Sequence, residues 1–271
     1  GKTTDLARLA DLGRKGVLLL MCDSTNAERP GYTMSERTVG ETFEDIFMDA
    51  KSRIIVASFA SNVHRIQQAI DAAAKFNRKV TVVGRSMMNV VNVAMELGYL
   101  NVPDGMMVDV DLIDKYPPEK MVILTTGSQG EPMSALSRIA VNEHKKVEIE
   151  PGDLVIISAS PIPGNEKSIF KVINELFKKG ADVIYESLAD VHVSGHACQE
   201  ELKLMHSLVR PRFFMPVHGE YRHLKQHANL AAKMGMPPEN IFMMENGQVL
   251  ELGPDSARIN GSGTSGRILV D

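Results

Sequence analysis

Short apolar runs rich in Val and Ile alternate along the chain with longer stretches in which apolar residues recur at helical spacing. Several of the short runs are continuously apolar, which is typical of parallel strands that are buried on both faces of a sheet. This pattern predicts strands over residues 17–22, 54–57, 80–83, 122–125, 154–158, 183–185 and 213–217.

The stretches between these runs predict amphipathic helices. Ser35 is a candidate N-cap, and Gly98 and Gly180 stand where C-cap glycines are expected. Helices are therefore expected over residues 35–51, 62–76, 87–97, 165–179, 199–208 and 221–234. Strand and helix alternation of this kind predicts an α/β fold with a largely parallel sheet.

The composition is that of an ordinary globular protein, with 44% apolar and 24% charged residues among 271. A chain of this length is expected to form one large or two modest domains with a substantial core. Residues 261–266 are the only linker-like stretch, and residues 268–270 predict a short strand after it.

The formal net charge of −4 does not predict a broad basic surface. Any nucleic acid contact must then come from a local basic surface or from backbone donors. Cys22 and Cys198 are far apart and outside any CxxC motif, so we expect no disulfide framework and no cysteine zinc site. We expect a buried free thiol at Cys22, a reducing cytoplasmic location, no signal peptide and no membrane-spanning segment.

Small, polar, glycine-containing loops follow most of the predicted strands. Ligands of open α/β sheets bind beyond the carboxyl ends of the strands, and free N–H groups there favour anions. Any one of these loops could serve only to close a turn. Taken together they favour a phosphate-bearing ligand, and they comprise residues 23–26, 58–62, 84–86, 126–131, 159–165 and 218–220.

Three histidines are candidates for chemistry. His192 and His196 share one short segment, and His218 directly follows a predicted strand. Histidine is a common metal ligand and general acid or base. Asp23 ends another apolar run, where its carboxylate could orient a histidine or merely cap a turn.

The other histidines predict less. We expect structural or surface roles for His64, His144 and His206. His223 and His227 are four residues apart on a predicted helix and lack the Glu of an HExxH motif, so we expect them on a solvated face.

Four segments carry a family resemblance. Residues 23–28 (DSTNAE) resemble β-CASP motif A, residues 192–201 (HVSGHACQEE) motif B, and residues 215–224 (MPVHGEYRHL) motif C. Residues 126–136 (TGSQGEPMSAL) are similar to a stretch characteristic of the ribonuclease J family. Their order and spacing agree over essentially the whole chain, which therefore resembles this family of metallo-β-lactamase/β-CASP RNA nucleases.

The resemblance implies a fold and its domains. It implies a Rossmann-like parallel-sheet β-CASP domain together with part of a metallo-β-lactamase αββα fold. Residues 1–30 would end the first half of the metallo-β-lactamase domain, residues 31–190 would form the β-CASP domain, and residues 191–271 would return to the metallo-β-lactamase domain.

The resemblance also implies a mechanism. Such enzymes hydrolyse RNA phosphodiesters with two zinc ions, at internal sites and from a 5′-monophosphate end, in RNA processing and mRNA decay. By motif matching, His218 would be a zinc ligand, His196 would contact the scissile phosphate or protonate the leaving group, and Asp23 would orient His196. The residues implied to bind RNA or its phosphates are Ser194, Gly195, His196, Ala197, Ser128 and Gln129.

One departure matters. The zinc-binding HxHxDH motif of the family is absent from this sequence, and His218 alone cannot hold two ions. We therefore expect the chain to be a fragment that is inactive alone, from a parent that is a zinc-dependent ribonuclease. The resemblance implies single-stranded RNA as partner, no membrane, and a homo-oligomer or a hetero-oligomer with a paralogue.

Three alternatives remain open. The first is a catalytically weak paralogue that acts as an RNA-binding or assembly subunit. The second is another β-CASP hydrolase, such as a cleavage factor, against which the TGSQGEP stretch argues. The third is a Rossmann-like nucleotide binder, which the lack of a GxGxxG motif and of a Walker A lysine makes the weakest.

Overall fold

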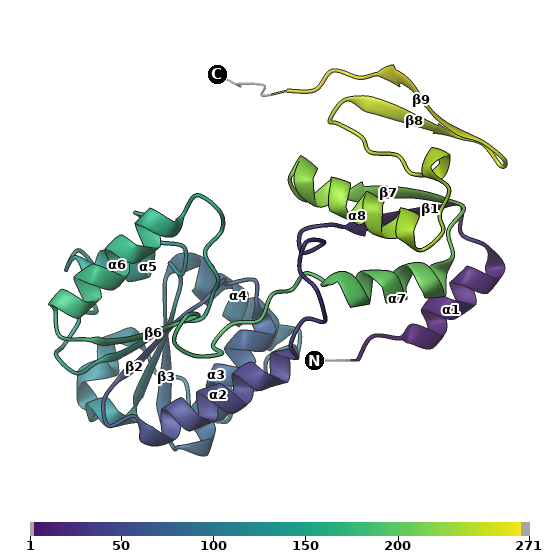
Figure 1. Cartoon of the computed structure of the whole chain (residues 1–271). Helices are drawn as coiled ribbons and strands as arrows, with labels where there is room; N and C mark the ends of the chain where they lie inside the picture. The colour runs from purple at the N-terminus through teal and green to yellow at the C-terminus, as the bar shows by residue number, and fades with distance from the viewer. Residues whose placement is uncertain (1–2, 267–271) are drawn as a thin grey trace. The chain divides into compact units, whose positions relative to one another are not determined.

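A computed structural model describes residues 3–266 of the chain (Figure 1). The chain divides into two compact units. Unit 1 is residues 34–193, and unit 2 combines residues 3–33 with residues 194–266. No helix in the described part of the chain is long and apolar enough to cross a membrane.

Unit 1 is built on a five-stranded sheet whose pairs are all parallel, in the order β3-β4-β2-β5-β6. The prediction of a largely parallel sheet is thus confirmed. Every residue of β2 and β4 is buried, as their continuously apolar sequences indicate. The strands are β2 (Ile54–Ala57), β3 (Lys79–Val83), β4 (Met121–Thr125), β5 (Leu154–Ile157) and β6 (Asp182–Tyr185).

Two apolar clusters cover the two faces of this sheet. Ile54 and Val56 of β2 belong to one cluster, and the alternating Ile55 and Ala57 belong to the other, because successive strand side chains point to opposite faces. The first cluster holds α2 (Glu36–Asp49), α3 (Val63–Lys75) and α4 (Arg85–Glu96). The second holds the 3₁₀ helix η1 (Val110–Lys115), α5 (Ala135–Ala140) and α6 (Glu166–Lys178), and α5 and α6 lie opposite α2 and α3 in Figure 1.

The order of the strands creates a switch point in unit 1. Neighbouring strands β2 and β4 continue into α3 and α5, which belong to opposite faces of the sheet. The loops that follow them therefore separate, and such a crevice is the usual ligand site of open α/β sheets. A cavity of about 820 Å³ lies there, lined among others by Ser58, Gly84 and Ser128.

Unit 2 contains two small sheets. Strand β1 (Leu19–Asp23) pairs in parallel with β7 (Phe213–Val217), and β8 (Gln248–Leu252) forms an antiparallel hairpin with β9 (Ala257–Ser262). Its helices are α1 (Leu6–Lys15), α7 (Gln199–Val209) and α8 (Tyr221–Lys233), and two 3₁₀ helices complete the chain, η3 (Pro238–Asn240) here and η2 (Pro118–Lys120) in unit 1.

Helices α1 and α5 and strands β8 and β9 were not predicted from the sequence. Helix α1 has no buried residue, α5 spans only six residues, and β8 and β9 are largely exposed. Gly261 and Ser262 belong to β9, so the expectation that a linker starts at Gly261 is wrong. The strand expected over residues 268–270 lies outside the described residues.

Gly13 explains how closely α1 packs against α7. A Cβ atom at this position would lie 2.1 Å from the Leu208 carbonyl oxygen of α7, so only glycine permits the approach. We predict that Gly13→Ala destabilises the protein by about 1–3 kcal/mol, the usual cost of overpacking. Arg14→Ala, on the exposed side of α1, is the control in thermal unfolding. Equal melting temperatures for the two variants would contradict the prediction.

Candidate active site

The pairing of β1 with β7 brings Asp23 and His218 to one edge of unit 2. Asp23 is the last residue of β1 and lies opposite Val217, the last residue of β7, so His218 follows directly. The Ser24 N–H donates to the His218 carbonyl at 3.2 Å. Both functional side chains are thus placed by strand ends in register.

His196 completes a cluster with these two residues. Its Nδ1 lies 2.8 Å from Asp23 Oδ2, and His218 Nε2 lies 3.9 Å from the same oxygen. The ring centroids of the two histidines are 5.3 Å apart. One ligand atom from each of the three residues falls within 4.8 Å of the others, and the described residues contain no second group of this kind.

The electrostatics of the cluster favour an ionised Asp23. Partial burial raises the pKa of this carboxyl, but hydrogen bonds from the Thr25 N–H and from His196 outweigh burial, so the net pKa lies below its usual value. Burial and the neighbouring Asp23 charge raise the pKa of the Cys22 thiol to about 11. Cys22 is partly rather than fully buried, and both cysteines are free thiols.

The turn at residues 194–197 is held by Asn26. Its Nδ2 donates to the Ser194 hydroxyl and to the His196 carbonyl, both at 2.9 Å. Ser194 Oγ also accepts from the His196 N–H at 3.2 Å. Open space surrounds the position that a Cβ atom of Gly195 would occupy, so a ligand can approach the backbone there. Sequence reasoning missed Asn26, although it belongs to the DSTNAE segment.

Glu201 and Thr33 hold the far side of the same turn. Glu201 Oε2 accepts from the Cys198 N–H at 2.8 Å, within a capping box that starts α7, and from the Thr33 N–H at 3.0 Å. The Thr33 hydroxyl lies 2.9 Å from the His196 carbonyl oxygen. These two residues were also missed, because nothing in the sequence shows that residues 33 and 201 are neighbours.

His218 has an unusual backbone conformation. Its φ of 57° is left-handed, a region that costs a non-glycine residue free energy and is common at functional sites. Gly219 follows with a φ of 144°, and a Cβ atom there would lie 3.0 Å from the His223 side chain. His223 Nδ1 accepts from the Glu220 N–H at 3.0 Å, which fixes the turn after His218.

The expectation that His223 and His227 lie on a solvated face is wrong, since they are 9% and 0% exposed. His227 Nδ1 lies 3.0 Å from Ser24 Oγ, and its Nε2 lies 3.3 Å from Nε2 of the buried His206. Burial lowers the pKa of His206 to about 4, and burial together with His206 lowers that of His227 to about 3. Helical spacing alone could not show that α8 buries its polar-looking face.

Ser128 and Gln129 lie in unit 1, on the loop after β4. Ser128 is 2% exposed and lines the cavity at the switch point. The Gln129 amide donates to the Ser160 carbonyl at 2.9 Å and accepts from the Ile162 N–H at 2.8 Å. Both polar groups of Gln129 are therefore engaged within the protein.

The cluster suits part of a zinc site. Imidazole and carboxylate are ligands that zinc prefers, and catalytic zinc usually takes three protein ligands. Asp23, His196 and His218 offer that number at most, and one Asp23 oxygen is already engaged with His196. The described residues fit the partial coordination of one ion and do not supply ligands for two.

Family comparisons agree with this picture. The family described as "Ribonuclease J, beta-CASP domain" matches residues 51–176, and the "Zn-dependent metallo-hydrolase RNA specificity domain" matches residues 180–244. A crystal structure of a protein of unknown function from Enterococcus faecalis V583 shares the fold, with a TM-score of 0.57 and 14% identity over 94% of this chain and 54% of that one. The two family models thus identify a β-CASP domain followed by an RNA specificity domain of Zn-dependent metallo-hydrolases.

Curated relatives narrow the class. The chain is 51% identical to ribonuclease J 1 of Streptococcus pyogenes over 100% of this chain and 48% of the relative. It is 49% identical to ribonuclease J of Helicobacter pylori over 99% of this chain and 39% of the relative, and 48% identical to that of Mycobacterium tuberculosis. The chain belongs to the ribonuclease J family, and it spans less than half the length of these relatives.

The buried histidine pair generates a pH prediction. Below about pH 6.5 these two histidines become protonated in the unfolded state, whereas His206 and His227 stay neutral in the folded state. The free energy of unfolding should therefore fall between pH 6.5 and 4. Each tenfold change in proton affinity corresponds to about 1.4 kcal/mol, so the loss should reach several kcal/mol. Denaturant unfolding across this pH range measures it.

His227→Gln provides the matched test. This variant should be less stable at pH 7 but should lose less stability on acidification, because one titrating group is gone. His64→Gln, at an exposed histidine in unit 1, is the control and should keep the parent's slope. The assignment fails if the His227→Gln slope equals that of the parent.

Proposed function

We propose that the chain is the β-CASP-containing portion of a zinc-dependent ribonuclease J, which hydrolyses RNA at internal sites and from a 5′-monophosphate end in RNA processing and decay. The observation that carries the proposal is the hydrogen-bonded pair of Asp23 and His196 beside His218. In this proposal residues 31–190 form the β-CASP domain, and residues 1–30 and 191–271 belong to the metallo-β-lactamase domain.

His196 acts on the proton of the leaving group. When Nδ1–H donates to Asp23, Nε2 is free to face the substrate. The lowered pKa of Asp23 keeps this carboxylate ionised, and its bond to Nδ1 holds the ring in place. In this proposal His196 gives a proton from Nε2 to the departing RNA oxygen and takes up another from solvent.

His218 binds metal in this proposal. Its side chain is 66% exposed at the end of β7, and its left-handed backbone is held by Gly219 and His223. Zinc bound there would supply a hydroxide near neutral pH and offset charge on the phosphate. Two ions need more ligands than the described residues offer, so we propose that the chain alone is inactive.

The turn of residues 194–197 binds phosphate. Gly195 leaves open space, and the N–H groups of Gly195 and Ala197 have no protein acceptor among residues 3–266. Backbone N–H groups of this kind suit an anion. Ser128 contacts the RNA backbone from its cavity, whereas Gln129 acts indirectly by holding the loop of residues 160–162.

The remaining features of the proposal come from the family resemblance. Single-stranded RNA is the partner, in a homo-oligomer or a hetero-oligomer with a paralogue, in the cytoplasm. The relatives are named ribonuclease J, which supports an RNA substrate.

The proposed activity can be tested by supplying further zinc ligands on an additional segment. A chimera that joins this chain to an upstream segment with the HxHxDH motif that the family resemblance implies should cleave 5′-monophosphorylated RNA, whereas the chain alone should not. In the chimera, His196→Ala should keep the zinc content but slow cleavage by about 10²–10⁴-fold. His218→Ala should lower the zinc content, measured by plasma emission spectroscopy.

His64→Ala is the control in the chimera, because this exposed residue lies outside the cluster. Cleavage at the parent's rate by the His196→Ala chimera would refute the proton-transfer role. Cleavage by the unaltered chain that His218→Ala abolishes would show that it builds a working metal site by itself.

Phosphate recognition is tested on the chain itself. A 5′-phosphorylated oligoribonucleotide should bind more tightly than its 5′-hydroxyl twin in fluorescence anisotropy. Asn26→Ala should reduce this preference by roughly tenfold, because two hydrogen bonds that hold the turn are lost. Equal affinities for the two oligonucleotides in the parent chain would remove the phosphate pocket from the proposal.

A further inference from the structure

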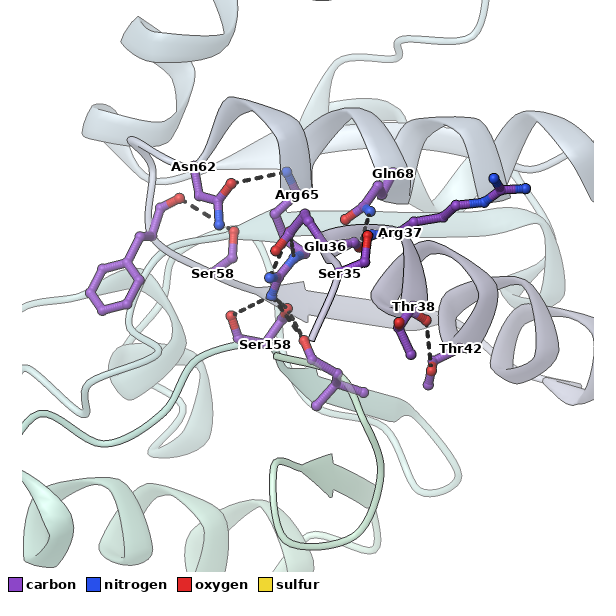
Figure 2. A network of polar contacts seen from close by, with 12 residues as sticks. Ser35, Glu36, Arg37, Thr38, Thr42, Ser58, Asn62, Arg65, Gln68 and Ser158 are labelled. Carbon is purple, nitrogen blue, oxygen red and sulfur yellow. Dashed lines mark hydrogen bonds and ion pairs between the residues drawn. The ribbon is translucent and has the colours of Figure 1, made fainter. Parts of the chain in front are cut away.

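The chain passes between the two units twice, after Thr33 and after Val193. On the side of unit 1, a polar network centred on Arg65 of α3 lies next to both passages (Figure 2). Glu36 comes shortly after the first passage, and Val191 comes shortly before the second. Arg65 contacts both Glu36 and Val191.

The contacts of Arg65 are direct. Its Nε donates to Glu36 Oε1 at 2.7 Å, and its Nη2 lies 2.7 Å from the same oxygen. Its Nη1 donates to the Val191 carbonyl at 2.9 Å and to the Ser158 hydroxyl, which in turn donates to Val191 O at 2.6 Å. One side chain, which is 0% exposed, therefore joins both connecting segments.

The network is built on α3 and on the end of β5. Asn62 caps α3 by accepting from the Arg65 N–H at 3.1 Å, and Ser158 directly follows β5 at the sheet edge. Gln68, one turn further along α3, donates to the Glu36 carbonyl at 2.7 Å. Both connecting segments are thus tied to α3, and the second is also tied to β5.

Arginine is chemically suited to this place. A planar guanidinium presents donors in several fixed directions, so it can reach a carboxylate and a carbonyl at once, whereas a lysine ammonium cannot reproduce that fork. A buried charge must be paired, and Glu36 provides the opposite charge. Removing Glu36 would leave the fully buried guanidinium without its opposite charge, at a large desolvation cost.

Unit 2 ties the same two segments on its own side. The Gln199 N–H donates to the Arg29 carbonyl at 3.0 Å, and the Glu200 N–H donates to the Gly31 carbonyl at 3.1 Å. Thr33 adds its contacts to Glu201. Each unit therefore holds its own ends of the two connecting segments together, unit 1 through Arg65 and unit 2 through the start of α7.

We propose that Arg65 is a positioning residue that anchors both connections where they leave unit 1. By holding Val191, it fixes the start of the short segment that leads into residues 194–197. This inference goes beyond the proposed RNA chemistry, because the anchoring exists whether or not the chain binds RNA.

A buried arginine elsewhere in unit 1 gives a matched control. Arg53 is 5% exposed, and its Nη2 donates to Asp153 Oδ2 at 2.6 Å and to the Glu148 carbonyl at 2.7 Å. The chemistry is the same as that of Arg65, with one carboxylate and one carbonyl, but the partners lie near β5 and away from both connections. If Arg65 only stabilised unit 1, substitutions of Arg65 and Arg53 should have similar effects.

Hydrogen exchange with mass spectrometry on the full chain is the test. In Arg65→Lys, amides of residues 34–37 and 189–194 should exchange roughly ten- to a hundredfold faster, the range expected for losing hydrogen bonds to a charged group. Arg53→Lys should instead speed exchange around residues 148–154. Uniform acceleration throughout unit 1 in both variants would overturn the proposal.

Ser158→Ala keeps the test decisive if Arg65→Lys does not fold. This variant removes the hydroxyl between Arg65 and Val191 without burying an unpaired charge. It should speed exchange in residues 189–194 and leave residues 34–37 unchanged, since Glu36 does not contact Ser158. Unchanged exchange in residues 189–194 would overturn the proposal.

Oligonucleotide binding gives a second readout, which rests on the proposed function. Arg65→Lys should lose most of the preference for a 5′-phosphate, whereas Arg53→Lys should retain it at equal overall stability. If the parent itself shows no preference, the phosphate pocket fails and hydrogen exchange alone decides on Arg65. A preference retained in Arg65→Lys despite faster local exchange would refute the positioning of residues 194–197.

Discussion

Parallel pairing between β1 and β7 joins two parts of the chain that are separated by all of unit 1. Because both strands run in the same direction, Asp23 and His218 reach the same edge. Five residue pairs of the ladder set their register, and the backbone bond from Ser24 to His218 continues it. A shift of one residue would turn the Asp23 side chain to the opposite face. The candidate site therefore depends first on backbone hydrogen bonds and only then on its side chains.

Much of this arrangement was predictable because it follows local rules. Continuously apolar runs predicted the parallel strands of unit 1, and the polar residues at strand ends included Asp23 and His218. His196 was found instead in the short segment before α7. The supporting contacts were not predictable. Asn26 holds the turn of residues 194–197 through bonds that span about 170 residues of sequence, which no local pattern reveals.

The histidines of α8 show a second limit of sequence patterns. A histidine can be buried as a neutral ring when other rings and a hydroxyl provide partners, as His206, Ser24 and Phe214 do for His227. Arg65 cannot be neutralised in this way and takes a carboxylate as its partner. The buried polar residues of unit 2, His206 and His227, are thus neutral, whereas the buried Arg65 of unit 1 is charged and paired with Glu36.

The interruption of unit 2 by unit 1 has a consequence for the order of folding. Closing a flexible loop of roughly 160 residues, 34–193, costs about 4–5 kcal/mol of chain entropy before β1 can meet β7. Once unit 1 has formed, Arg65 already holds Glu36 next to Val191, and most of that entropy has been lost. A protein built this way should assemble its inserted unit first and its discontinuous unit second.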